Sequence, residues 1–572
     1  MKGKIALFLF ALPFLGIGVW MLISIGGNLI DASRMQSWQP VFAQLSSAGY
    51  RSRSGDNSDT YEAFAHYTYS FGGQQYTGTR VGISGGADNI GDYHQKLGNR
   101  LSAAKNRGEQ IQIYVNPDDP TEAIIDRTLR WGLLGFKSIF LFLFGGFGFG
   151  LMVFLLRAPK PKDTSDPQYA DRPWLMNDAW QMATIRSSSK AAMYTTWGFA
   201  GVWNLISAPL PFVLYEEVVE KENYIGLVGL LFPLVGIGLL VWAVRRTLEW
   251  KRFGPAPVTL DPYPGAIGGH VGGTIEVNLP YDASAKFPLT LTNIYSYRSG
   301  SGKNRSRREQ AKWQDSLLAH TERGVNGTRL SFRFELPEGL AESDAERSTE
   351  SYHLWRLNLK ADLPGVDIDR DYEIPVYKTG EKSRNLSERV IESARVETEQ
   401  FDDVAVRAKM RLSYGIHGKS LFYPAGRNIG SALTGLIIGA IFGGIGWFLF
   451  GKERSIFGSV FFGVGLLIVI GSFYSVLNSL QVMQDSVHLK SVRRLLGIPI
   501  RRRQIRRDEF TRFSKDSSMQ TQSGSKHVMQ YTIYAEDRQG QKIVIGEGFK
   551  GDNEANAAIR LAASEFGLTE KK

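Results

Sequence analysis

Seven arginines between residues 493 and 507 carry the clearest chemical signal in this sequence. They follow the end of an apolar stretch by about 15 residues, and anionic lipid headgroups attract a basic segment at such a position by roughly 1 kcal/mol per charge. We therefore expect the segment to contact anionic headgroups at a membrane surface. The candidate contacts are Arg493, Arg494, Arg501, Arg502, Arg503, Arg506 and Arg507.

Two other interpretations of this basic segment stay open. A basic run is also typical of proteins that bind nucleic acid. Its position beside an apolar stretch, and the lack of aromatic residues among the arginines before Phe510, favour lipid, so no nucleic-acid partner is predicted. The charges are alternatively a solvated surface that fixes the orientation of the neighbouring membrane helix.

No other pattern along the chain predicts catalysis or metal binding. Cysteine is absent, which excludes disulfides, thiolate metal sites and cysteine nucleophiles. None of the eight histidines is paired at a metal-ligand spacing, and no Gly-x-Ser-x-Gly motif occurs. The segment from Ser413 to Ser420 nearly spells a phosphate loop, but Ser replaces the first Gly and no helix pattern follows. We predict no catalytic residue, no cofactor and no metal.

Six long apolar stretches must position the basic segment and everything between them. Each has about 20 residues, the length of helix that crosses a bilayer. The mean hydropathy of −0.17 conceals them because the rest of the chain is polar. The predicted spans are residues 5–27, 133–156, 193–215, 224–243, 430–450 and 456–478.

Lysines and arginines near the span ends predict the orientation. Lys2 and Lys4 hold the N-terminus in the cytoplasm, and the loop 28–132, with 10 basic and 11 acidic residues, crosses the membrane. The loop 244–429 begins with a basic group, and the tail 479–572 has 17 basic and 11 acidic residues. Both are predicted to be cytoplasmic, so the two termini lie on one side.

Three glycines in the fifth predicted span form one ridge of a helix. Gly435, Gly439 and Gly443 recur every four residues, and such small residues let a second helix approach closely. We expect the last span to pack on this ridge. The alternative is that two copies of the chain associate through it as a homo-oligomer.

The loop between the first two spans is predicted to form a small β-rich domain over residues 37–132. Alternation from Tyr61 to Ser70 indicates a strand, Gly72-Gly73 a turn, and residues 88–107 a helix. The Tyr-rich hairpin and the closing Tyr-x-Asn-Pro-x-x-Pro segment resemble the membrane-anchored domain of unknown function 3592. The residues that carry the resemblance are Tyr67, Tyr69, Gly73, Tyr76, Gly78, Gly108, Ile113, Tyr114, Asn116, Pro117 and Pro120. The resemblance implies a β domain held at a membrane and brings no activity.

Residues 255–412 are predicted to form a cytoplasmic β-sandwich. Five alternating stretches at short intervals indicate its strands: 274–279, 289–295, 330–336, 353–359 and 371–377. The phrases Phe334-Glu335-Leu336-Pro337, Trp355-x-Leu357 and Glu373-Ile374-Pro375-Val376 resemble arrestin-like β-sandwiches, which implies a protein-binding scaffold. Residues 386–411 favour a helix, with a strand as the alternative because of their valines.

Residues 482–569 are predicted to form a third module, with several strands and one terminal helix. Asp552 or Asn553 can cap that helix and Gly567 can end it. This order of elements, and the segment Leu495–Pro499 before the arginines, resemble the bacterial pleckstrin-homology-like fold.

These predictions describe an α+β membrane protein with six transmembrane helices, an extracytoplasmic β-rich domain, a cytoplasmic β-sandwich and a C-terminal pleckstrin-homology-like domain. We expect it to be integral to the bacterial cytoplasmic membrane and to act as a non-enzymatic scaffold that positions unidentified protein partners on both faces. A transporter or channel component is one alternative, which the lack of Asp, Glu, Arg and His in the middle of the spans disfavours. A membrane enzyme without a recognisable motif is the other.

Overall fold

The computed structural model of the chain divides into two compact units. The first comprises Met1–Pro161 and Phe199–Gly238, and the second Lys162–Gly198 and Leu239–Lys572. The structure describes residues 2–54, 59–157, 167–215, 219, 229–300, 305–325, 327–347, 349–384, 386–415, 418–427, 429–453, 456–523 and 526–569.

The first unit begins with an apolar helix, α1 (Lys2–Arg34), which packs on the helical segment that follows the β domain. That segment consists of α3 (Trp131–Phe140), the π-helical turn η2 (Leu141–Gly145) and α4 (Gly146–Arg157). The two segments approach so closely that a Cβ added to Gly18 would lie 2.3 Å from the Cα of Gly145. Lys137, the one charged residue inside a predicted span, donates to the Ser24 hydroxyl of α1 at 2.9 Å.

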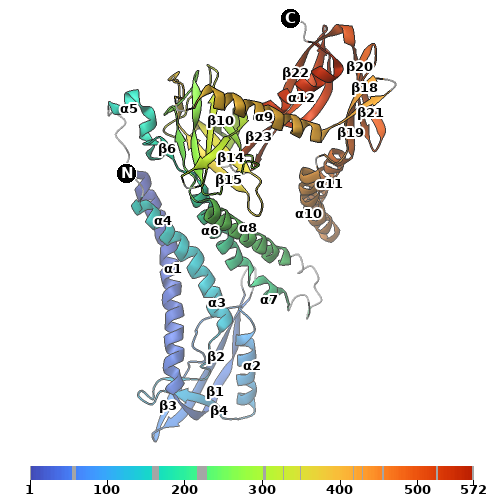
Figure 1. Ribbon diagram of the computed structural model, residues 1–572. Coiled ribbons are helices and arrows are strands. Elements are labelled where there is room, and N and C mark those ends of the chain that lie inside the picture. The colour runs from blue at the N-terminus through green and yellow to red at the C-terminus, as the bar shows by residue number, and fades with distance from the viewer. Residues whose placement is uncertain are drawn as a thin grey trace. The chain divides into compact units, whose positions relative to one another are not determined.

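The β domain of the first unit is a five-stranded antiparallel sheet of order β3-β2-β1-β4-β5 (Figure 1). Its elements are β1 (Gln39–Arg53), β2 (Thr60–Phe71), β3 (Gln74–Gly78), α2 (Tyr93–Asn106), β4 (Ile111–Val115) and β5 (Ala123–Ile124). The predicted hairpin is confirmed, since Gly72 and Gly73 join β2 to β3 at φ values of 59° and 82°. The helix begins later than predicted because Asp88 instead pairs with Tyr61 in a β-bridge.

Four helices in the described part of the chain are long and apolar enough to cross a membrane. They are Leu7–Ser37, Trp131–Arg157, Leu231–Phe253 and Ile456–Leu477, and a shorter apolar helix spans Ala432–Phe448. The prediction of one continuous span at 193–215 is wrong. Pro209 lacks the N–H that a helix interior needs, and the chain there forms two helices, α6 (Ser189–Ser207) and α7 (Leu210–Tyr215). Residues 224–228 of the span predicted at 224–243 lie outside the described residues, and α8 (Leu231–Phe253) covers the rest.

The second unit contains a sandwich of two antiparallel sheets, of order β11-β10-β14-β15 and β12-β13-β9-β7-β6 (Figure 1). The strands are β6 (Thr184–Ile185), β7 (Val258–Leu260), β9 (His270–Val277), β10 (Pro288–Ser299), β11 (Ser306–Leu318), β12 (His320–Gly324), β13 (Gly327–Glu335), β14 (Ser351–Ala361) and β15 (Ile368–Ile374). Leu291 and Leu357 of one sheet share a core with Ile275 and Leu330 of the other. All five alternating stretches therefore lie on strands, although Pro375 separates β15 from β16 (Val376–Tyr377).

The sandwich begins earlier in the chain than predicted. Strand β6 precedes α6 and pairs with β7, although the helices α6, α7 and α8 lie between the two strands in the sequence. Trp180 beside it is 1% exposed and donates from its indole N–H to the carbonyl of Glu373 at 2.9 Å. A two-residue strand is too short to show an alternating pattern, so β6 could not be predicted from the sequence.

Helix α9 (Glu388–Lys409) confirms the helical interpretation of that segment and leads to the C-terminal module. The module has two sheets, of order β17-β18-β19-β20-β21 and β22-β23-β24. Its elements are β17 (Arg411–Gly415), β18 (Gly418–Tyr423), β19 (Asn478–Gln484), β20 (His488–Leu495), β21 (Ile498–Arg506), β22 (Phe510–Ser523), β23 (Lys526–Asp537), β24 (Lys542–Lys550) and α12 (Gly551–Phe566).

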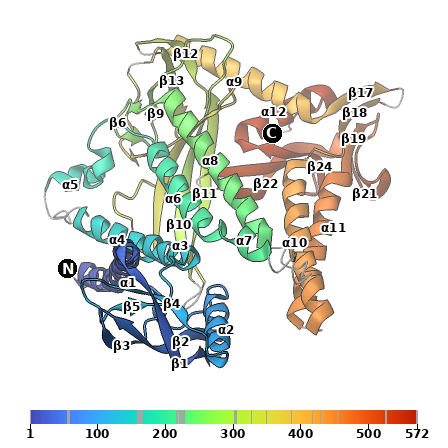
Figure 2. The ribbon, with the colours of Figure 1, turned by 90° about the horizontal axis from the view of Figure 1, so that it is seen from below.

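Two apolar helices interrupt this module, and its predicted start at residue 482 is too late. Helices α10 (Ile429–Glu453) and α11 (Ile456–Leu477) run side by side as a hairpin between β18 and β19 (Figure 1, Figure 2). Because the hairpin returns the chain to its starting point, β18 pairs directly with β19. The segment 413–420, which nearly spells a phosphate loop, belongs to the β17–β18 hairpin, and its residues 416 and 417 lie outside the described part.

Candidate functional site

Helix α9 covers a cavity at the edge of the sandwich. Ser387 caps the helix, because its side chain accepts a hydrogen bond from the N–H of Val390. Thr398 fixes the middle of the helix to β11. Its Oγ1 accepts from the N–H of Leu318 at 2.9 Å and donates to the carbonyl of Ala394 at 2.7 Å.

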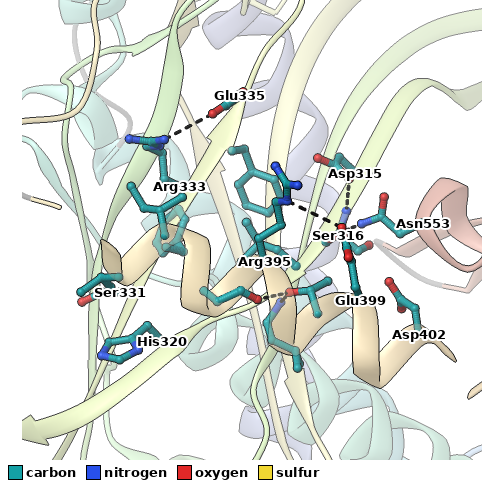
Figure 3. Close-up of a pocket in the computed structure, with 18 of the residues that line it drawn as sticks. Asp315, Ser316, His320, Ser331, Arg333, Glu335, Arg395, Glu399, Asp402 and Asn553 are labelled. Carbon is teal, nitrogen blue, oxygen red and sulfur yellow. Dashed lines mark hydrogen bonds and ion pairs between the residues drawn. The ribbon is translucent and has the colours of Figure 1, made fainter. Parts of the chain in front are cut away.

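The cavity has a volume of about 320 Å³ and is lined by α9, by β11 and β13, and by α12 (Figure 3). The α9 lining combines an apolar stretch, Val390, Ile391 and Ala394, with polar and charged residues, Arg395, Thr398, Glu399 and Asp402. Figure 3 shows Arg333 and Glu335 on one side, and Asp315, Asn553 and Asp402 on the other. The cavity thus has an apolar stretch on α9 and charged groups at two ends.

Arg333 of β13 forms the basic end. Its side chain is 5% exposed and pairs with Glu388 at 2.7 Å and with Glu335 at 3.3 Å. The hydrogen bond that Arg333 donates to Glu388 raises the pKa of Arg333. The Nε of Arg333 is buried and has no hydrogen-bond partner among the described residues. An unused buried donor costs free energy.

Asp315 of β11 and Asp402 of α9 form the acidic end. Burial raises the pKa of Asp402 to about 7, and the nearby Glu554 carboxylate adds to the shift. Burial also raises the pKa of Asp315. Asp402 therefore gains and loses its proton around neutral pH, which gives this end of the cavity a charge that depends on pH.

Hydrogen bonding, apolar contact and proton exchange are the chemistry that this cavity offers. No group of three His, Cys, Asp or Glu in the described ranges is placed to hold a metal ion. Sequence reasoning missed the cavity because its residues come from four elements that are far apart in the chain. The one available signal was the apolar stripe of Val390, Ile391 and Ala394 on the predicted helix.

The seven predicted arginines lie on β20, on β21 and just after it, and most of them contact protein groups. The contacts are Arg493 with Glu547, Arg494 with Gln481 at 2.7 Å, Arg503 with the carbonyl of Lys542 at 3.2 Å, Arg506 with Asp508 at 2.9 Å, and Arg507 with the carbonyls of Phe566 and Gly567 at 3.4 Å. Arg501 and Arg502 are exposed, and their side chains form no hydrogen bond or ion pair with another residue that the structure describes. Two of the seven predicted arginines, Arg501 and Arg502, therefore have unpaired side chains among the described residues.

Glu547 of β24 joins the ends of α10 and α11. It accepts hydrogen bonds from Arg427, which lies just before α10, and from Arg493. Both arginines also bind the side-chain oxygen of Asn478, the first residue after α11, at 2.8 and 3.1 Å. The side chains of Arg427 and Glu547 are only 9% and 19% exposed. One partly buried cluster therefore fixes both helix ends to the module.

A second buried ion pair joins α8 to the sandwich. Arg370 of β15 is fully buried, pairs with Glu249 of α8, and donates to the carbonyl of Gly254 at 3.1 Å. Arg252 adds a hydrogen bond of 2.6 Å to the carbonyl of Pro364. Helix and sheet are held by charge-assisted bonds, which are shorter and stronger than neutral ones.

The first unit has the same kind of junction. Arg130, the residue before α3, donates from both terminal nitrogens to the Asp88 carboxylate at 2.7 Å. Although burial opposes the shift, these hydrogen bonds lower the pKa of Asp88. Arg80 pairs with Asp31 of α1 at 2.5 Å. An arginine–carboxylate contact thus joins each β module to a membrane helix.

The glycine ridge of α10 lies against α11. A Cβ on Gly435 would lie 2.3 Å from the Ser472 hydroxyl, and one on Gly439 would lie 2.9 Å from the carbonyl of Gly465. Gly443 is different, since its own Cβ would meet open space while its backbone lies against Gly465. Two of the three glycines therefore face α11 within the same chain.

Comparison with known proteins supports part of the sequence interpretation. Residues 42–130 match the family model described as Domain of unknown function (DUF3592), so this segment is a DUF3592 domain. No curated protein matches the chain. Among solved structures, the sporulation control protein Spo0M from Bacillus subtilis matches 44% of this chain and 87% of its own, at 10% identity. Its TM-score of 0.15 is too low for any structural conclusion.

Proposed function

We propose that this chain is a non-enzymatic scaffold of the bacterial cytoplasmic membrane that holds protein partners on both faces. In this proposal six segments cross the membrane and both termini are cytoplasmic. The DUF3592 domain lies outside, and the sandwich and the C-terminal module lie inside. The observation that supports it is that an arginine–carboxylate contact joins every β module to a membrane helix.

A scaffold needs modules that keep a fixed position on their helices, and buried charged junctions supply this. Breaking such a pair leaves an uncompensated charge away from water, so the joined state is strongly favoured over a separated one. A carrier that alternates between states is expected to have ionisable groups inside its spans. This chain has Lys137 alone there, and Lys137 is hydrogen bonded to a neighbouring helix.

The proposed cytoplasmic partner contacts the α9 cavity. The cavity combines an apolar stretch on α9 with the Arg333 guanidinium and a carboxyl whose pKa is about 7. A protruding peptide segment with one apolar and one polar side chain fits these features. The contact is then sensitive to substitutions on the inner side of α9 and insensitive to those on its outer side.

The orientation can be tested with introduced cysteines, because the chain has none of its own. Gln75→Cys lies on β3 and Gln539→Cys lies between β23 and β24, both at exposed positions. A membrane-impermeant maleimide applied to intact cells should label the first and not the second. Labelling of the second in intact cells would contradict the orientation.

The scaffold role can be tested by cross-linking in native membranes followed by mass spectrometry. We expect the tagged full chain to yield the same partner proteins in repeated captures, and Ile391→Glu, inside the cavity, to lose the cytoplasmic ones. Val404→Glu is the matched control, since Val404 lies on the same helix and is 68% exposed. Solute movement through liposomes by the purified chain, with no partner captured, would favour a transporter instead.

A further inference from the structure

The β20–β21 hairpin ends in an apolar tip that is exposed to water. Leu496 is 70% exposed, Ile498 68% and Ile500 48%. The two turn residues, Leu496 and Gly497, have φ values of 51° and 83°, as a type I′ turn requires. Asn is the usual first residue of such a turn, and Leu is disfavoured at positive φ. The chain therefore places a large apolar side chain at a position where both its backbone and its hydration are unfavourable.

The tip lies beside the end of a membrane helix. The N–H of Leu496 donates to the carbonyl of Leu477, the last residue of α11, at 3.3 Å. In the adjacent pair of strands, Leu495 is opposite Asn478, the first residue after α11. Tyr474, in the last turn of α11, is 41% exposed, and aromatic residues are typical of the membrane–water interface. Leu496 is thus at the level at which α11 leaves the bilayer.

Strand β21 carries a gradient from apolar to basic as it leads away from this end. Ile498 and Ile500 come first, and Arg501 and Arg502 follow Ile498 by three and four residues, or about 10–13 Å along a strand. The register shifts between Arg493 and Arg494, which leaves Ile500 as an extra residue on β21. This strand is also the edge of its sheet, so no described strand pairs with its outer side. The order of the side chains matches that of a bilayer surface, where acyl chains give way to phosphate groups.

The arginines at this gradient differ from their neighbours in having no protein partner. Arg493 is bound to Glu547, whereas the side chains of Arg501 and Arg502 form no hydrogen bond or ion pair with a residue that the structure describes. An unpaired guanidinium at a bilayer surface is attracted to the phosphates of anionic lipids. This combination of continuity with α11 and unpaired charge identifies the bilayer as the occupant of the surface.

We propose that the tip Leu496–Ile500 inserts into the leaflet in which α11 ends, while Arg501 and Arg502 bind anionic phospholipid headgroups. The insertion gives the C-terminal module a third attachment to the membrane, besides α10 and α11. It also fixes the tilt of the module against the surface. The proposal needs α11 to span a membrane, and it is independent of whether the chain acts as a scaffold.

The test uses the purified full chain in nanodiscs with one introduced cysteine that carries an environment-sensitive fluorophore. Ile498→Cys reports on the tip, and Gln539→Cys, an exposed turn residue, is the matched control. We expect aqueous iodide to quench the Ile498→Cys probe about twofold less than the control, and interfacial spin-labelled lipids to quench it more. Equal iodide quenching at the two positions, in neutral and in anionic nanodiscs, would overturn the insertion and leave the tip as a protein-binding surface.

A separate experiment tests the role of Arg501 and Arg502. The Ile498→Cys probe should lie deeper in the leaflet in nanodiscs that contain phosphatidylglycerol than in nanodiscs of phosphatidylcholine alone. The double variant Arg501→Gln, Arg502→Gln should abolish that difference in depth. Arg506→Gln is the control, because Arg506 already pairs with Asp508. A probe that responds equally to both lipid compositions in the parent protein would overturn the headgroup contact.

Discussion

Two groups of arginines lie near the ends of membrane helices, and they differ in what surrounds them. Arg370 and Arg427 have side chains that are 1% and 9% exposed and are bound to carboxylates. Arg501 and Arg502 are exposed and meet no protein anion among the described residues. Both groups consist of arginines near helix ends, so burial and pairing with a carboxylate decide what each arginine does. Paired arginines hold a module on its helix, and unpaired ones are available to lipid.

The largest effect is expected at Arg370. Arg370→Met removes the buried cation from Glu249 and leaves it with Arg246 at 3.2 Å and the N–H of Asp369 at 3.1 Å, which should cost about 3 kcal/mol of unfolding free energy. Thermal unfolding of the purified chain in detergent measures it. Arg347→Met is the control, since Arg347 pairs with Glu373 but its side chain is 57% exposed. Equal losses in the two variants would remove the distinction between buried and exposed pairs.

The next effect is expected at Glu547. Glu547→Gln removes the carboxylate shared by Arg427 and Arg493, and we expect a loss of about 2–3 kcal/mol because both guanidinium groups lose a charged hydrogen bond. The same unfolding measurement applies. Asp508→Asn, which removes the exposed partner of Arg506, should change stability by less than about 0.5 kcal/mol. If the two substitutions have the same effect, the Glu547 junction is not structural.

A smaller effect, dependent on pH, is expected at Asp402. Its pKa of about 7 in the folded chain exceeds the ordinary aspartate pKa of 3.8, so the folded state binds more protons between these two pH values. Stability should therefore fall as pH rises from about 4 to about 7, and then stay level. Solvent screens this partly exposed carboxyl, so we expect the loss to be about 1 kcal/mol.

Asp402→Asn should remove this slope and make the chain more stable than the parent at pH above about 7. The groups that act on Asp402 are Glu554 and Arg560 of α12, Asp403 of its own helix, and Asp315 of β11. Glu392→Gln is the control, since Glu392 lies on the same helix, is 63% exposed and is not among these groups. The pH range from about 5 to about 8 contains the raised pKa of Asp402. An unfolding temperature of the parent protein that is constant over this range would contradict the raised pKa.

The smallest effect on stability is expected at the unpaired arginines. The double variant Arg501→Gln, Arg502→Gln should change the unfolding free energy by less than about 0.5 kcal/mol, as is usual for exposed charges. In anionic nanodiscs the same variant should increase the quenching of the Ile498→Cys probe by iodide. A large loss of stability would show that these arginines belong with the paired group.

Most strands of the sandwich could be predicted from the sequence because their side chains alternate between core and solvent. His353 to Leu359 on β14 is an example, since Leu357 and Leu359 are fully buried. Strand β6 and the join of β18 to β19 could not be predicted. They depend on pairings between strands that are separated by helices in the sequence, and a local pattern carries no information on such distant partners.

The arginine segment shows the same limit at the level of single residues. The sequence identified its charge, but not that Arg493 meets Glu547, which is 54 residues away. Nor could it reveal that Glu249 and Arg370, 121 residues apart, form a buried pair. The α9 cavity was hidden for the same reason, because β11, β13, α9 and α12 each supply part of its lining.

The central claim is that paired arginines hold the modules rigidly on their helices, and one distance measurement tests it most directly. Spin labels at Val241→Cys on α8 and Lys378→Cys on the sandwich can be placed without interference, since the chain has no native cysteine. We predict a narrow distance distribution in the parent chain that broadens when Arg370→Gln is added. A distribution that is broad in the parent, or unchanged by the substitution, would contradict the account.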